Sequence, residues 1–168
     1  FRRVLFRSSE WLAPVADLPR WATAHAMLHP EFPVVEGRYQ MTRDWAVTLP
    51  GQFSRRVEDG SLVFWRPGIT AWTIAWNNDK GESQKERLDW LRRDTSPEAF
   101  DQEVLADGDL IRFAYRLTEP REEGVVHALY AFAIGVAGHI QMAIYFDDKS
   151  DLELAREIWR SLDETRVA

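Results

Sequence analysis

The sequence predicts an α+β fold, with an antiparallel sheet of six to seven strands flanked by an inserted helix and a C-terminal helix. Short runs of alternating apolar residues lie between turn sequences such as Asp59-Gly60, a pattern typical of antiparallel strands. Two capping boxes, which begin at Ser83 and Ser150, mark the starts of the two helices. Two strands near the C-terminus are apolar on both faces, so each side of the sheet needs a covering layer.

The first 37 residues are expected to lie outside the main domain. Residues 1–9 contain three Arg but lack the apolar run of a signal peptide, so we expect a leader that is not native to the fold. Residues 10–37 are expected to form an N-terminal helical appendage, with Asp17 as a suitable cap. Its apolar residues recur at helical spacing: Trp21, Ala24, Met27 and Leu28. A single α+β domain is then expected over residues 38–168.

Within that domain the apolar alternation predicts seven strands, and turn residues separate them. The first two are divided by a turn at Pro50-Gly51. The strands are expected at residues 44–49, 53–58, 62–65, 69–76, 110–118, 125–136 and 139–146. The inserted helix is expected from Ser83 to about Arg93, followed by a short helical turn over residues 96–100. The final helix is expected to reach about residue 162.

Composition and charge exclude several classes of protein. The chain of 168 residues contains no Cys, which excludes disulfides, Cys-ligated zinc or iron–sulfur sites and a Cys nucleophile. A net charge of −6 argues against a nucleic-acid binder, which would normally be basic. No run of 18 apolar residues occurs, so no transmembrane helix is expected. We expect a cytoplasmic protein, although a chain without Cys is also compatible with the periplasm.

The acidic residues are concentrated in two segments. Residues 94–109 hold six acids and no base, and residues 147–164 hold seven acids and three bases. If the two segments adjoin in space, they form one negative surface that suits a basic partner. The alternative is a solvated face that maintains solubility. The candidate protein-binding residues are Asp94, Glu98, Asp101, Glu103, Asp107 and Asp109.

Two histidines are the candidates for catalysis. His127 and His139 lie on the last two long strands, where either one is a possible general base with Asp147 as its acid. The alternative is a buried, neutral histidine with a structural role, and no G-x-S-x-G sequence supports a serine nucleophile. His25 and His29 have the spacing of half a zinc site, but Ala26 stands where a metalloprotease needs Glu. We therefore expect neither a metal nor a cofactor.

Three stretches of the sequence resemble the Mog1/PsbP-like superfamily, which includes the DcrB-like proteins. They are Trp45-Ala-Val-Thr-Leu-Pro-Gly51, Asp59-Gly-Ser-Leu-Val-Phe64 and Leu154-Ala-Arg-Glu-Ile-Trp-Arg-Ser-Leu162. The resemblance covers about residues 38–163 and implies an antiparallel sheet flanked by helices in a binding or assembly factor. It transfers no catalytic residue to this chain.

These observations together predict a non-catalytic protein-binding module, a chaperone- or immunity-type partner of another protein such as a secreted effector. The alternative is a small hydrolase-like enzyme or a ligand-binding domain with a His-containing pocket. The protein partner is expected to be basic or hydrophobic, and a homodimer is compatible with the sequence. A chaperone should expose an apolar groove, whereas an immunity protein should expose a charged patch.

Overall fold

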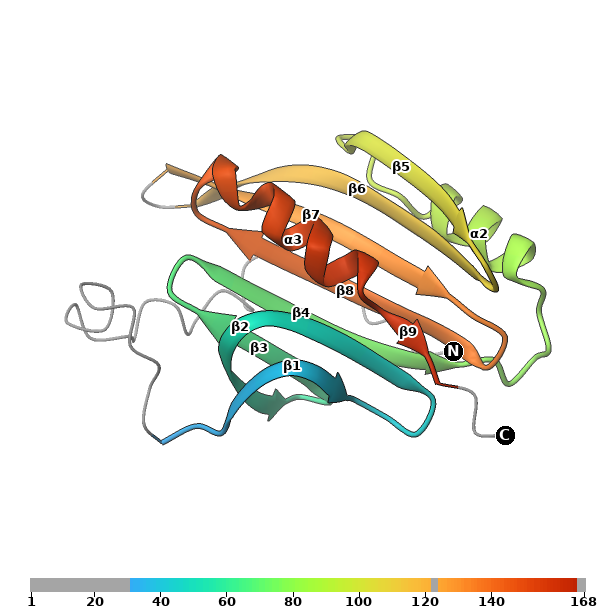
Figure 1. Ribbon diagram of the computed structural model, residues 1–168. Coiled ribbons are helices and arrows are strands. Elements are labelled where there is room, and N and C mark those ends of the chain that lie inside the picture. The colour runs from blue at the N-terminus through green and yellow to red at the C-terminus, as the bar shows by residue number, and fades with distance from the viewer. Residues whose placement is uncertain (1–30, 122–123, 166–168) are drawn as a thin grey trace.

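The computed structural model describes residues 31–121 and 124–165 of the chain. They form one antiparallel sheet with the strand order β1-β2-β3-β4-β8-β7-β6-β5, and β9 pairs with β2. The strands are β1 (Val34–Gln40), β2 (Trp45–Glu58), β3 (Ser61–Arg66), β4 (Ile69–Asn77), β5 (Phe100–Asp107), β6 (Leu110–Arg121), β7 (Gly124–Ile134), β8 (Gly138–Phe146) and β9 (Asp163–Glu164). The sheet curls around helix α3 (Leu152–Arg160), which lies along its concave side (Figure 1).

The main core lies between α3 and the concave face of the sheet. Strand alternation sends every second side chain of β8 toward the helix, including Ile140, Met142 and Ile144, which are fully buried. On the helix, Ile158 and Trp159 are also fully buried. The indole Nε1 of Trp159 donates a hydrogen bond to the carbonyl of Phe132, 2.9 Å away. This bond and the apolar contacts fix α3 on the sheet.

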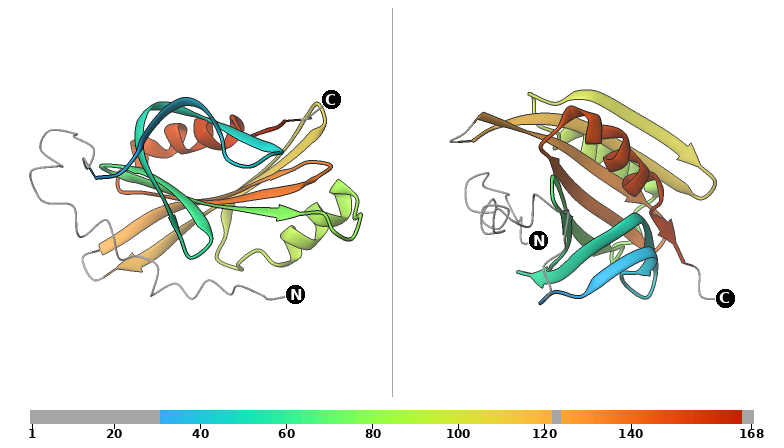
Figure 2. Two further views of the ribbon diagram at one scale, coloured as in Figure 1. Left: turned by 90° about the horizontal axis from the view of Figure 1, so that it is seen from below. Right: turned by 60° about the vertical axis from the view of Figure 1, so that its left-hand side comes forward.

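Helix α2 (Gln84–Arg93) lies on the opposite side of the sheet (Figure 2). The capping box expected at Ser83 is present: its hydroxyl accepts from the Glu86 amide at 3.2 Å, and its own amide donates to the Glu86 carboxylate at 2.8 Å. Leu91 packs in a second apolar cluster with Phe113 and Phe132. The helix therefore covers the β6–β7 part of this face and reaches the start of β8 through Arg87 and Trp90.

The expected fold class is wrong, because the chain is richer in strands than its sequence pattern suggests. The sheet has nine strands and only two short α-helices accompany it in the described ranges. The two strands expected on either side of Pro50-Gly51 are one continuous strand, β2, while β1, β5 and β9 were not expected. Residues 34–37, which were assigned to the N-terminal appendage, begin β1. Residues 1–30, which include the expected leader and appendage helix, lie outside the described residues.

Glycine explains why β2 continues where a turn was expected. Gly51 has a φ of +86°, which other residues rarely adopt, and the pairing with β1 shifts register beside it, between Val35 and Gly37. This irregularity bends β2 without ending it. The first part of β2 pairs with β1 and β9, and its last part pairs with β3.

The start of α3 also differs from the expectation. The capping box predicted at Ser150 does not form, because Asp148 provides the cap: its carboxylate accepts a hydrogen bond from the Ser150 amide at 2.8 Å. A short 3-10 helix, η1 (Lys149–Asp151), then leads into α3. The acidic residues of this segment thus cap a helix, as expected, although through a different residue.

Candidate functional site

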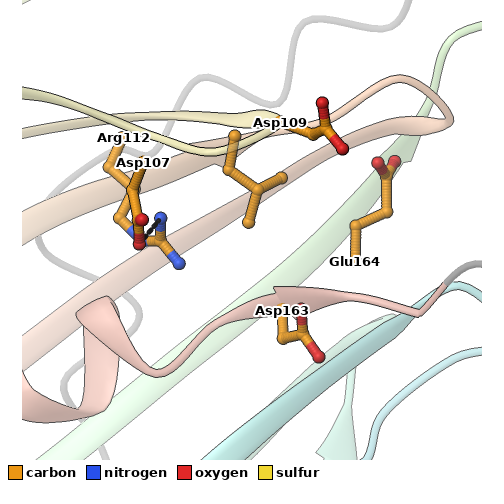
Figure 3. Close-up of a pocket in the computed structure, with 6 residues that line it drawn as sticks. Asp107, Asp109, Arg112, Asp163 and Glu164 are labelled. Carbon is orange, nitrogen blue, oxygen red and sulfur yellow. Dashed lines mark hydrogen bonds and ion pairs between the residues drawn. The ribbon is translucent and has the colours of Figure 1, made fainter.

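A pocket of about 420 Å³ lies between the β5–β6 turn and β9 (Figure 3). We call it the acid-lined pocket, because four of its six lining residues are carboxylates. Those six residues are Asp107, Asp109, Leu110, Arg112, Asp163 and Glu164. The first two acids belong to one acidic segment of the sequence and the last two to the other. The fold therefore brings the two acidic segments together at this place.

A buried arginine organises one wall of the pocket. Arg112 is only 5% exposed, and its guanidinium donates to the Asp107 carboxylate at 3.1 Å and to the Leu162 carbonyl at 2.7 Å. These bonds tie the β5–β6 hairpin to the chain just before β9. The Nε of Arg112 is buried and has no acceptor within the described part of the chain.

The carboxylates on β9 are also held in place. The Glu164 carboxylate accepts hydrogen bonds from the amides of Val136, at 3.0 Å, and Ala137, at 2.7 Å, in the turn between β7 and β8. The Asp163 carboxylate pairs with Arg38 at 3.0 Å. Because backbone amides and a guanidinium hold the two side chains, their positions do not depend on a ligand.

Gly135 makes room for the Glu164 carboxylate, and replacing Gly135 by Ala is expected to expel it. A Cβ at position 135 would lie 2.4 Å from the Glu164 carboxyl carbon. We expect the free energy of unfolding to fall by about 1.5 kcal/mol, because hydrogen bonds to a charged group would be lost. Urea denaturation measures this. In a Glu164→Ala background, Gly135→Ala should cost less than about 0.5 kcal/mol, and an equal cost in both backgrounds would contradict this account.

The structure places the six acids predicted from the sequence in different local settings. Asp107 and Asp109 line the acid-lined pocket. Asp101 pairs with Arg116 at 2.7 Å, and Glu103 pairs with two arginines of α3, at 2.8 and 3.6 Å. The other two residues lie at the α2 end of the segment: Asp94 is the C-cap of α2, and Glu98 follows it before β5.

The structure adds three residues that the sequence prediction did not select. Asp163 and Glu164 come from the second acidic segment, which the charge pattern had indicated as a possible neighbour. Arg112 lies in a strand whose alternation gave no sign of a functional role. Its position in the pocket follows from strand pairing, which places it beside the β5–β6 turn.

The two candidate catalytic histidines lie on opposite faces of the sheet. His127 pairs with Phe146, on the face of the sheet that packs against α3, whereas His139 pairs with Trp76 on the opposite face. Asp147 is exposed and follows the end of β8. The structure therefore does not bring the two histidines together, and Asp147 lies at the end of the sheet where His127 pairs with β8.

His139 lies in an aromatic and cationic environment. Its ring stacks on Trp76, with 6.1 Å between centroids, and lies 6.5 Å from the ring of Trp90. Burial, with a smaller contribution from the Arg87 guanidinium, lowers the pKa of His139 to about 4. The imidazole is therefore neutral at physiological pH. The Arg87 guanidinium itself donates to the carbonyls of Gly135 and Gly138.

A search of the described residues finds no group of three or more His, Asp or Glu side chains arranged to hold a metal ion. His25 and His29, considered above as half of a zinc site, lie outside those residues. No helix within the described ranges is long and apolar enough to cross a membrane.

Comparison with known proteins identifies only a similar fold. No family model matches the chain, and no curated protein matches it. Among solved structures, the chain is similar to a crystal structure from Bacteroides thetaiotaomicron, with a TM-score of 0.60 and 11% sequence identity. The match covers 79% of this chain and 50% of the other, so this chain spans about half the length of that structure. At this level of identity the likeness concerns the fold alone.

Proposed function

We propose that this protein is a non-catalytic binding module that recognises a basic segment of a partner protein at the acid-lined pocket. The observation that carries the proposal is the meeting of two acidic segments, distant in sequence, around one pocket. Asp107 and Asp109 come from the β5–β6 turn, while Asp163 and Glu164 come from β9. Carboxylates gathered in this way attract cationic side chains and speed association with a basic partner.

The pocket suits a cationic side chain. A Lys or Arg side chain of a partner protein would interact with the carboxylates that line it.

Charge recognition fits the described surface better than capture of a hydrophobic segment. The exposed large apolar side chains are distributed over several strands and α2. They are Val34, Val57, Trp90, Phe100, Val104, Val125 and Val136. Scattered apolar residues of this kind are normal on a protein surface. We therefore favour an immunity-type or assembly role over a chaperone role, and membership of the Mog1/PsbP-like superfamily stays a prediction.

The proposal is tested with a labelled decapeptide of alternating Lys and Ala and with the full chain. We expect fluorescence anisotropy to report saturable binding that weakens as salt concentration rises, because the attraction is between charges. Replacing Asp107 and Asp109 by Asn should weaken binding about tenfold, since two carboxylates of the pocket lose their charge.

A control double variant separates the pocket from net charge. Glu36→Gln combined with Asp59→Asn removes the same charge from exposed positions on β1 and on the β2–β3 turn. This control should change Kd less than about twofold. Equal weakening by the two double variants, or no binding of the peptide by the unmodified chain, would refute recognition at the pocket.

A further inference from the structure

Strand β5 forms one edge of the sheet (Figure 1). Within the described part of the chain it pairs with β6 alone. A strand at the edge of a sheet presents backbone N–H and C=O groups that have no partner in the sheet, and these groups can pair with an added strand. Asp107, the last residue of β5, also lines the acid-lined pocket. The free edge of β5 therefore leads directly to that pocket.

The hairpin between β5 and β6 determines which backbone groups face outward. Its turn has two residues, Gly108-Asp109, and Asp107 pairs with Leu110 across it. In a hairpin of this kind the closing pair is hydrogen-bonded and the pairs then alternate, so every second residue directs its N–H and C=O away from the partner strand. On β5 these residues are Val104 and Ala106, and both are exposed.

The two faces of β5 carry different side chains. Asp107 lies on the face toward α3, because it pairs with Leu110 of the main core, and its side chain is 77% exposed. Glu103 lies on the same face and bonds to an arginine of α3 at 2.8 Å. Val104 and Ala106 lie on the opposite face, as strand alternation requires. An added strand would therefore meet carboxylates on one face and small apolar side chains on the other.

A β-bulge limits the regular part of this edge. Asp101 has a φ of +51°, and the pairing with β6 shifts register between Phe100 and Glu103. The regular part covers residues 103–107, which span about 17 Å. Bulges and charged residues normally prevent uncontrolled pairing of edge strands. The edge thus accommodates one short strand, and that strand would end at the acid-lined pocket.

The charges of β5 select the kind of strand that suits it. Two copies of this chain paired in antiparallel fashion around Leu105 would place Glu103 of each copy opposite Asp107 of the other. Like charges directly opposite each other on neighbouring strands are destabilising. Lys or Arg at these positions would instead be attracted to the carboxylates. Charge complementarity therefore favours a cationic strand of another protein over a second copy.

We propose that the basic partner segment binds as an extended strand, which pairs antiparallel with β5 and ends at the acid-lined pocket. This inference rests on the proposed function and adds the conformation and the sequence pattern of the ligand. Cationic side chains of the segment alternate with small apolar ones. The cations face Asp107 and the other carboxylates of the pocket, and the apolar side chains lie beside Val104 and Ala106. Main-chain hydrogen bonds to β5 provide affinity, and the alternating side chains provide specificity.

Backbone N-methylation of the alternating Lys and Ala decapeptide tests strand addition, because it removes amide donors and leaves the charge unchanged. One peptide is methylated on three central Ala amides and its matched control on three central Lys amides. Ala residues opposite Val104 and Ala106 would donate their N–H groups to β5, whereas the Lys amides would face solvent. We expect Ala methylation to weaken binding at least about tenfold and Lys methylation less than about threefold, by fluorescence anisotropy.

The outcomes separate this inference from the proposed function. Binding of the unmodified peptide with equal effects of the two methylations, or with a larger effect of Lys methylation, would overturn strand addition and leave recognition at the pocket intact. No binding of the unmodified peptide would refute the proposed function and this inference with it.

A cysteine on β5 tests the location of the added strand, because the chain has no Cys of its own. Ala106→Cys changes an exposed residue at the free edge. We expect it to form a disulfide with a decapeptide that carries Cys at one central Ala position about tenfold faster than Val57→Cys does. Val57 is the control because it is 69% exposed and belongs to β2. Equal rates for the two variants would contradict pairing with β5.

Discussion

Replacing Trp159 by Ala is expected to lower the free energy of unfolding by about 4 kcal/mol, as is typical when a buried Trp is truncated. The side chain is fully buried at the centre of the contact between α3 and the sheet. Its removal leaves a cavity that the surrounding strands cannot fill, because hydrogen bonds hold them in register. It also deletes the bond from Nε1 to the Phe132 carbonyl.

Urea denaturation followed by circular dichroism measures this loss, and two variants provide controls. Trp90→Ala makes the same chemical change at a residue of α2 that is 50% exposed, and it should cost less than about 1 kcal/mol. Trp159→Phe keeps most of the apolar contact and loses the hydrogen bond, so it should cost about 1 to 2 kcal/mol. Similar losses for the two Trp→Ala variants would contradict a core centred on α3.

Acidification from pH 7 to pH 5 is expected to remove about 2 kcal/mol of stability through His139 alone. Burial lowers the pKa of this histidine to about 4 in the folded chain, against an ordinary value of 6.5. Between these two values the unfolded chain binds a proton that the folded chain does not. Stability therefore falls as pH drops below about 6.5 and levels off below about 4.

The His139 contribution is isolated by comparing the unmodified chain with His139→Gln at both pH values. The variant should lose less stability than the unmodified chain over this range, by about 2 kcal/mol. Proton NMR provides an independent check, because the His139 ring signal, assigned by its absence from the variant, should titrate near pH 4. A midpoint near 6.5 would contradict the buried, neutral state.

Local patterns predicted the elements whose causes are local. The α2 helix begins at Ser83 because a capping box needs only residues three positions apart. The hairpin at Asp59-Gly60 forms because both residues adopt positive φ angles, as this turn requires. Strands β6 to β8 were recognised because apolar residues recur, at alternate positions or more often, along segments of nine or more residues.

Elements that depend on distant partners were missed, because local sequence patterns carry no information about those partners. The sequence of β5 is acidic and reads as a loop, but Glu103 is balanced by arginines of α3, which lies far along the chain. Strand β9 has two residues, and the second, Glu164, is held because its carboxylate accepts hydrogen bonds from backbone amides of the β7–β8 turn. No local pattern predicts such strands, because their stability comes from pairing partners and ion pairs elsewhere in the chain.

The sequence by itself determined the chemistry available to this protein: carboxylates concentrated in two segments, no thiol, and aromatic residues on strands that alternate in and out of the core. Only the tertiary structure decided how these groups meet. It joined Asp107 and Asp109 to Glu164 in one pocket, put His127 and His139 on opposite faces, and gathered Tyr130 and its neighbours on one side of the sheet. The physical reason is that strand order and register are settled by long-range pairing and burial, whereas composition and periodicity report only on neighbours in sequence.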